Sequence, residues 1–239
     1  RQAPLGNRAN TLAHMALSQI GLRITSCQSC PRLLAYCARI AQDKRLAFRN
    51  DVYWGKPVPG FGDVRARLVI LGLAPAAHGA NRTGRTFTGD SSGDTLMNAL
   101  HSSGFANLPT SRHLRDELKL SDAYITSVVR CAPPNNRPLA REALNCQKHL
   151  QAEMKALSRV QVVVALGRTA FDSYWRWLAE NIVSVRPRPK FVHSSVYKPS
   201  GGPWLLASYH PSLQNRNTGR LTQTMLSDLF KQARTLLDH

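Results

Sequence analysis

The five cysteines of the chain have a spacing that could bind a metal. Cys27 and Cys30 form a C-x2-C pair, which lets two thiolates hold one metal centre, and Cys131 and Cys146 could complete a four-thiolate set. A structural zinc site usually has two such pairs, so one pair with two dispersed cysteines suits an iron–sulfur cluster as well as it suits zinc. Free buried thiols are the alternative, and Cys37 is expected to be a core residue.

A histidine that could take part in catalysis follows an apolar run at 204–209. A lone histidine is usually structural, but His210 would lie at the carboxyl end of a strand, where α/β folds place their ligands. The loop after it mixes an apolar side chain, small polar groups and arginines, which suits insertion into a base stack with contacts to phosphates. The candidate DNA-binding residues of this loop are Ser212, Leu213, Asn215, Arg216 and Arg220.

The glycine-bearing loop at 72–90 could hold a flat ligand. Its glycines allow positive φ and a close approach of the backbone to a ligand, and Phe87 offers a flat face among them. The loop lacks the Gly-Lys-Ser/Thr sequence that closes a phosphate-binding loop. The expected guest is therefore a planar base rather than a triphosphate.

The elements that must position these residues follow from the apolar pattern. Runs bounded by turn residues predict buried strands, at 67–73, 123–129, 160–166 and 204–209. Helical spacing predicts helices, at 8–26, 31–42, 94–100, 141–157, 169–180 and 222–237. Proline-rich segments predict loops, at 53–63 and 184–203. Strands that alternate with helices favour an α/β three-layer sandwich, with a central four-stranded parallel sheet flanked by helices.

Composition indicates the partner. The chain has 239 residues, with 32 Lys and Arg against 14 Asp and Glu, and a net charge of +18. Such a surplus usually serves a polyanion, so nucleic acid is the expected partner; a solvated basic surface without a partner is the alternative.

The same totals bound the organisation of the chain. A hydrophobic content of 43% supports a real core, and we expect one domain over 1–239, with a helical segment at about 8–42 that contributes two of the cysteines. No apolar run approaches the ~20 residues that span a bilayer, and no signal-peptide pattern opens the sequence. We therefore expect a cytoplasmic protein.

Together these motifs resemble those of the family 5 (type B) uracil-DNA glycosylases, within the uracil-DNA glycosylase superfamily. The matching segments run from Tyr53 to Asp63, Gly72 to Asp90, Arg130 to Pro134, His210 to Asn215 and Thr218 to Thr222. The resemblance implies a four-stranded parallel sheet flanked by helices. It also implies a [4Fe-4S] cluster on four of the cysteines, which are Cys27, Cys30, Cys131 and Cys146. The implied activity is hydrolysis of the N-glycosidic bond of uracil in DNA, which begins base excision repair, in the bacterial or archaeal cytosol.

The residues suit the chemistry that the resemblance implies. The target nucleotide must be everted from the duplex into a pocket, where Phe87 and the backbone of Ala74, Pro75 and Ala76 would hold the base. Departure of the base leaves positive charge on the sugar and negative charge on the base. A carboxylate can orient water and stabilise the cation, while His210 stabilises the anion.

Position along the chain indicates which carboxylate would activate the water. Many superfamily members carry an acid or amide inside the Gly-x-x-Pro turn, where this chain has Leu73 and Ala74. Family 5 shares this gap, and its water-activating role belongs to an aspartate downstream of the loop. Asp94, at the start of the next predicted helix, fits best, and Asp90 is the second choice. A plain helix cap is the alternative role for Asp94.

Selectivity is expected to be broad. Uracil-specific relatives carry an asparagine near the end of the second strand, where this chain has Thr126 and Ser127. The resemblance therefore implies removal of other deaminated bases, such as hypoxanthine. Asn136 or Asn81 could replace the missing amide, although asparagine is also common in turns.

Two other classes of function compete with this prediction. A non-catalytic DNA-binding iron–sulfur protein explains the charge and the cysteines, but leaves Phe87 and His210 without a role. A nucleotide-dependent enzyme is disfavoured by the missing phosphate-loop lysine. The expected partner is DNA that contains uracil or other deaminated bases, bound by a monomer.

Overall fold

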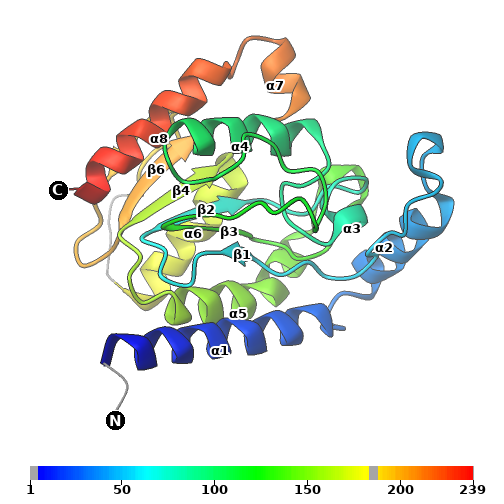
Figure 1. Cartoon of the computed structure of the whole chain (residues 1–239), viewed down its shortest axis with the longest axis horizontal. Coiled ribbons are helices and arrows are strands. Elements are labelled where there is room, and N and C mark those ends of the chain that lie inside the picture. Colours follow the sequence, from blue (N-terminus) through cyan, green and yellow to red (C-terminus); the bar gives the residue numbers. More distant parts are fainter. Residues whose placement is uncertain (1–4, 183–187, 239) are drawn as a thin grey trace.

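The computed structural model describes residues 5–182 and 188–238, with a sheet between layers of helices (Figure 1). The sheet has six strands in the order β1-β3-β2-β4-β6-β5. Its central strands are parallel, with bounds β2 (Leu68–Gly72), β3 (Ala123–Ser127), β4 (Val162–Leu166) and β6 (Trp204–Ser208). The four-stranded parallel core of the predicted α/β fold is confirmed.

Each edge of the sheet carries a short strand that the sequence pattern did not predict. β1 (Phe61–Gly62) pairs antiparallel with β3, and β5 (Val196–Tyr197) pairs antiparallel with β6. Both strands have two residues and lie in segments predicted as loops, because so short a run shows no alternation. Residues 184–187 of the second segment lie outside the described residues.

Helices cover both faces of the sheet (Figure 1). One face is covered by α4 (Ser91–Ser102) and α8 (Gln223–Asp238), and the other by α5 (Ala140–Ala156) and α6 (Arg168–Asn181). The alternation of side chains in the strands builds both cores. Leu68 and Ile70 of β2 belong to the α4/α8 core, whereas Val69 and Leu71 belong to the α5/α6 core.

The N-terminal helices extend the second layer. α1 (Leu5–Thr25) lies along the outer side of α5 (Figure 1), and α2 (Pro31–Asp43) follows it after the Cys27–Cys30 segment. Short helical elements interrupt the long loops, at η1 (Leu46–Phe48), α3 (Ala80–Thr83), η2 (Pro134–Asn136) and α7 (Leu213–Asn217). Among the described residues, no helix is long and apolar enough to cross a bilayer.

A buried ion pair ties the end of β3 to α5. Arg130 and Glu153 are each 1% exposed, and Arg130 Nη2 lies 2.6 Å from Glu153 Oε2. Thr126 Oγ1 donates to the same carboxylate oxygen at 2.6 Å and accepts a hydrogen bond from Arg130 Nη1. Because breaking such a pair leaves a buried charge without a partner, it fixes the segment that joins Ser127 to Cys131.

Candidate active site

A pocket opens at the carboxyl ends of the parallel strands. Its walls come from the loop after β2, the start of α4, the end of β3 and the loop after β6. The lining residues are Ala74, Pro75, Ala76, Thr86, Phe87, Asp90, Ser92, Ser127 and His210. The structure thus brings Phe87 and His210 together with the predicted turn residues of the glycine loop.

Phe87 is held in the pocket at a conformational cost. Its ring centroid lies 5.8 Å from that of His210, with 31° between the ring planes. The backbone of Phe87 has φ +51°, a left-handed conformation that costs about 1–3 kcal/mol in a residue with a bulky side chain. Gly72 makes room for the ring, because a Cβ at this position would lie 2.8 Å from Phe87 Cε2. The loop therefore presents an aromatic face at the expense of backbone strain.

A buried ion pair holds the loop that carries Phe87. Arg85 Nη2 lies 2.7 Å from Asp116 Oδ2 and donates to Ser111 Oγ at 2.9 Å, while Arg85 Nε donates to Thr88 Oγ1 at 2.9 Å. Burial alone would raise the pKa of Asp116, but the hydrogen bond from Arg85 and backbone N–H donors outweigh it and lower this pKa. The segment 85–88 is thereby fixed at both ends.

Removing the negative charge of Asp116 should destabilise the protein. We expect Asp116→Asn to lower the free energy of unfolding by about 3–5 kcal/mol at pH 7, because Arg85 loses its buried counter-ion. Urea unfolding at pH 7 measures this change. Asp228→Asn is the control, since the exposed Asp228–Lys231 pair should contribute less than about 0.5 kcal/mol. A loss for Asp116→Asn as small as that of the control would contradict the proposed anchor.

Asp90 lies in the pocket wall and caps α4. Its backbone is extended, and its Oδ1 accepts a hydrogen bond from Gly93 N at 2.9 Å. The other carboxylate oxygen, Oδ2, packs against Gly79, where a Cβ would overlap it. Burial raises the pKa of Asp90, and the nearby charge of Asp94 adds to the rise. The structure thus places beside Phe87 a carboxyl group whose ionised form is disfavoured by burial.

Asp94, the first choice from the sequence, lies in the first turn of α4 and is not among the pocket-lining residues. Its Oδ2 is 3.6 Å from Arg112 Nη1, and its Oδ1 is buried without a hydrogen-bond partner. The prediction that Asp94 could be the helix cap is wrong. The helix starts three residues earlier, at Ser91, because the side chain of Asp90 already satisfies its first turn.

His210 reaches the pocket from the loop after β6. Asn215 Nδ2 and Ser212 N each donate to the His210 carbonyl at 2.8 Å, which fixes the backbone that carries the ring. Removal from water lowers the pKa of His210 to about 4. The imidazole is therefore neutral at physiological pH and can donate a hydrogen bond from one ring nitrogen.

The predicted DNA-binding residues lie at the start of α7, on α7 and in the turn after it. Ser212 caps α7, and Leu213 is 54% exposed at its first position. Arg216 Nε is buried without a partner, and the guanidinium of Arg220 lies 4.4 Å from the centre of the Tyr209 ring. Asn215 differs from the others because its amide is engaged with His210.

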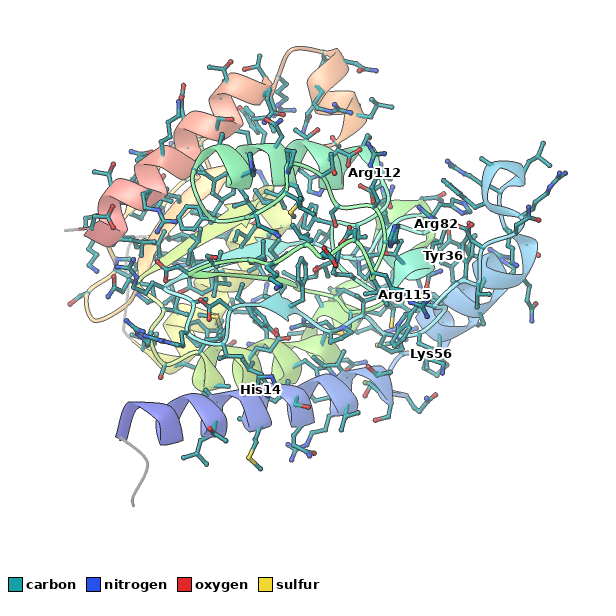
Figure 2. The ribbon with its side chains drawn as sticks, viewed as in Figure 1. His14, Tyr36, Lys56, Arg82, Arg112 and Arg115 are labelled. Carbon is teal, nitrogen blue, oxygen red and sulfur yellow. The ribbon has the colours of Figure 1, made fainter. Side chains whose placement is uncertain are left out.

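A second basic surface was missed by the sequence analysis. Arg82, Arg112 and Arg115 lie on one side of the molecule, beside α3 and the start of α4 (Figure 2). They line one groove together with Asp51, whose Oδ2 lies 2.7 Å from Arg82 Nη1, and with Leu114, which is 54% exposed. The Arg-His-Leu-Arg sequence at 112–115 is the signal that could have revealed it, because it resembles the apolar and basic mixture around Leu213.

Neither predicted replacement for the missing amide lines the pocket. Asn81 is fully buried, and its Nδ2 donates to Cys37 O at 3.3 Å and to Ala77 O at 3.4 Å. Asn136 is exposed in η2. The pocket instead holds three hydroxyl side chains that the sequence analysis did not select, Thr86, Ser92 and Ser127. Ser127 ends β3, at the position where the sequence lacks the asparagine of uracil-specific relatives, whereas no periodicity or motif distinguishes Thr86 or Ser92.

None of the five cysteines forms a disulfide. The pKa of Cys131 is raised by a hydrogen bond with Cys37, by burial, and by the nearby thiols of Cys146 and Cys30. Burial also raises the pKa of Cys146, with contributions from Cys30 and Cys27. The four predicted ligands are therefore neighbours, although no three His, Cys, Asp or Glu in 5–182 and 188–238 form a group that could hold a metal ion. Cys37 is fully buried, as expected.

Comparison with known proteins decides the family. Residues 59–234 match the model of the "Uracil DNA glycosylase superfamily". The chain belongs to this superfamily. It is 47% identical to the "Type-5 uracil-DNA glycosylase" of Mycobacterium tuberculosis (strain CDC 1551 / Oshkosh) over 222 residues, which cover 92% of this chain and 82% of that protein.

Relatives with the same name occur in other organisms. The chain is 46% identical to the Type-5 uracil-DNA glycosylase of Thermus thermophilus, over 89% of this chain and 94% of that protein. It is 43% identical to the one of Pyrobaculum aerophilum, over 88% of this chain and 89% of that protein. The predicted resemblance to the type 5 members of the superfamily is confirmed.

Proposed function

We propose that this chain hydrolyses the N-glycosidic bond of uracil in DNA and so begins base excision repair, as a single-domain cytoplasmic enzyme. The observation that carries the proposal is the shared pocket of Phe87, His210 and Asp90 at the carboxyl edge of the sheet. The net charge of +18 and the exposed side chains of Arg112, Arg115 and Arg220 suit a DNA substrate. The names of the relatives, which cover most of the chain, support the same activity.

Each group in the pocket has a separate role in this reaction. The everted base stacks on Phe87, and Leu213 enters the space that it leaves in the duplex. The Asp90 carboxylate orients the attacking water and stabilises positive charge on the sugar. Neutral His210 donates a hydrogen bond to the base oxygen on which negative charge develops. We place Asp90 ahead of Asp94 because Asp90 lines the pocket.

We further propose that other deaminated bases, such as hypoxanthine, are substrates. Among the described residues, no asparagine or glutamine side chain lines the pocket to make the paired contacts that restrict uracil-specific relatives. Small hydroxyl residues leave room for a larger ring, and Phe87 can stack on a purine as well as on a pyrimidine. The broad selectivity expected from the sequence thus remains the proposal.

A uracil-containing duplex tests the activity. Incubation with the protein should release free uracil and leave an abasic site, which alkali converts to a strand break at the uracil position alone. A matched duplex with thymine at that position is the control. Binding of both duplexes without release of any base would favour the alternative, a DNA-binding protein without catalytic activity.

We also propose that Cys27, Cys30, Cys131 and Cys146 hold a [4Fe-4S] cluster. Four thiols from three separate segments lie near one another, and an all-cysteine set is what such a cluster requires. When bound, the cluster would tie the segment before α2 to the loop after β3 and to α5. Arg130 and Glu153 join the last two of these segments by their ion pair, which supports a structural role for the centre.

Iron content tests the cysteine set. We expect protein purified without oxygen to be brown, with stoichiometric iron and acid-labile sulfide. Cys27→Ser should lose most of the iron, whereas Cys37→Ala should keep it, because Cys37 is outside the proposed set. Colourless protein with stoichiometric zinc, or an equal loss of iron in both variants, would contradict the proposal.

A further inference from the structure

One hydroxyl group in the pocket wall has no partner in the protein. Thr86 is 1% exposed and lines the pocket, and its Oγ1 is buried without a hydrogen bond. Buried polar groups in native proteins are nearly always hydrogen-bonded, and an unsatisfied one lowers stability. The unsatisfied Thr86 hydroxyl therefore lowers the stability of the free protein. A ligand that makes a hydrogen bond to this hydroxyl could remove the loss.

The surrounding segment holds Thr86 firmly at this place. Arg85, before it, is fixed by the buried ion pair with Asp116, and Phe87, after it, has the strained left-handed backbone. Thr86 thus lines the pocket together with Phe87, the residue on which a base would stack. Rotation about χ1 moves the hydroxyl of a threonine to another staggered position without moving the backbone, so the hydroxyl can turn toward a bound base.

We propose that the Thr86 hydroxyl is a substrate-binding group that makes a hydrogen bond to the edge of the everted base. The inference rests on the proposed function, because it names a group that would recognise the substrate of the same pocket. A hydroxyl can donate to a carbonyl or accept from an N–H. It therefore matches bases that carry a carbonyl beside a ring N–H, the edge that uracil and hypoxanthine share. The bond strengthens as the base departs, since negative charge collects on that carbonyl.

Thr86→Val tests the role of the hydroxyl, because valine keeps the shape and removes the polar group. We expect a loss of about 10- to 100-fold in single-turnover excision of both uracil and hypoxanthine, the range for a hydrogen bond to a charged group. Thr86→Ser should recover most of this loss. The melting temperature of Thr86→Val should equal or exceed that of the wild type, since an unsatisfied polar group is removed.

Thr95→Val is the matched control. Thr95 is buried on α4 outside the pocket wall, and its hydroxyl donates to Ser91 O at 2.8 Å. Its excision rates should stay within twofold of the wild type.

Three outcomes would overturn the proposal: a loss below threefold in Thr86→Val, an equal loss in Thr86→Ser, or a large fall in the melting temperature of Thr86→Val. If Thr86→Val does not fold, inhibition by free uracil in Thr86→Ser and Thr86→Ala replaces the rate comparison. Loss of inhibition in Thr86→Ala but not in Thr86→Ser would support the proposal, and similar inhibition of both would overturn it. Failure of the wild-type protein to release any base would instead refute the proposed activity.

Discussion

Asp90→Asn is expected to lower single-turnover excision of uracil by about 10²- to 10⁴-fold, the usual effect of losing a positioned acid–base group. The amide can still accept the hydrogen bond from Gly93 N and cap α4, since asparagine is as good a cap as aspartate. Binding of uracil DNA should therefore persist. Because burial raises the pKa of Asp90, its ionised form costs folding free energy, and the melting temperature of the variant should not fall.

Asp94→Asn is the decisive comparison for this assignment. Asp94 is on the same helix, one turn later, and is half-buried beside Arg112. We expect its substitution to lower excision less than tenfold, mainly through its charge near Asp90. A collapse of excision in Asp94→Asn, with near wild-type rates in Asp90→Asn, would contradict this assignment. It would show that Asp94, the first choice from the sequence, is the catalytic carboxylate.

His210→Leu is expected to lower single-turnover excision by about 10²- to 10³-fold, as when one donor to a developing anion is removed. His210→Gln keeps an amide donor at this place and should lose less. Quenched-flow measurement on uracil DNA gives both rates. Equal losses in the two variants would show that the ring acts through its shape and not through a hydrogen bond.

The protonation state of His210 gives this prediction a pH dependence. Since burial lowers its pKa to about 4, the ring stays neutral from about pH 5.5 to 8, and the wild-type rate should not rise as the pH falls across that range. The unfolded chain takes up this proton near pH 6.5, so His210 makes stability decrease as the pH falls from about 6.5 toward 4. A rate that grows toward pH 6, and that His210→Leu abolishes, would mean that the imidazolium is the active form.

Sequence patterns were sufficient for the elements with strong periodicity. The apolar runs predicted the central strands, because strands buried on both faces are nearly continuous in apolar residues. The shared pocket of Phe87 and His210 agrees with a topological rule, that parallel strands end at one edge of the sheet. The spacing of the cysteines suggested a four-thiolate set, but left zinc and an iron–sulfur cluster open, and only the resemblance to a family favoured the cluster.

The details of the site depend on contacts that no local pattern contains. Asp90 and Asp94 differ by one helical turn, and a start of the helix at Ser91 instead of Asp94 exchanges which of them faces the pocket. The strained φ of Phe87 depends on an anchor at Asp116, in another loop. Thr86 stands out only because its hydroxyl is buried without a partner, which is a property of the packed structure.

The central claim is that one everted base stacks on Phe87 with His210 at its edge. A crystal structure of Asp90→Asn bound to a uracil-containing duplex tests it most directly, because this variant is expected to bind without excision. We predict that the uracil ring lies against Phe87, with a base oxygen within hydrogen-bond distance of His210. A uracil that remains stacked in the duplex, or that occupies another cavity, would contradict the account.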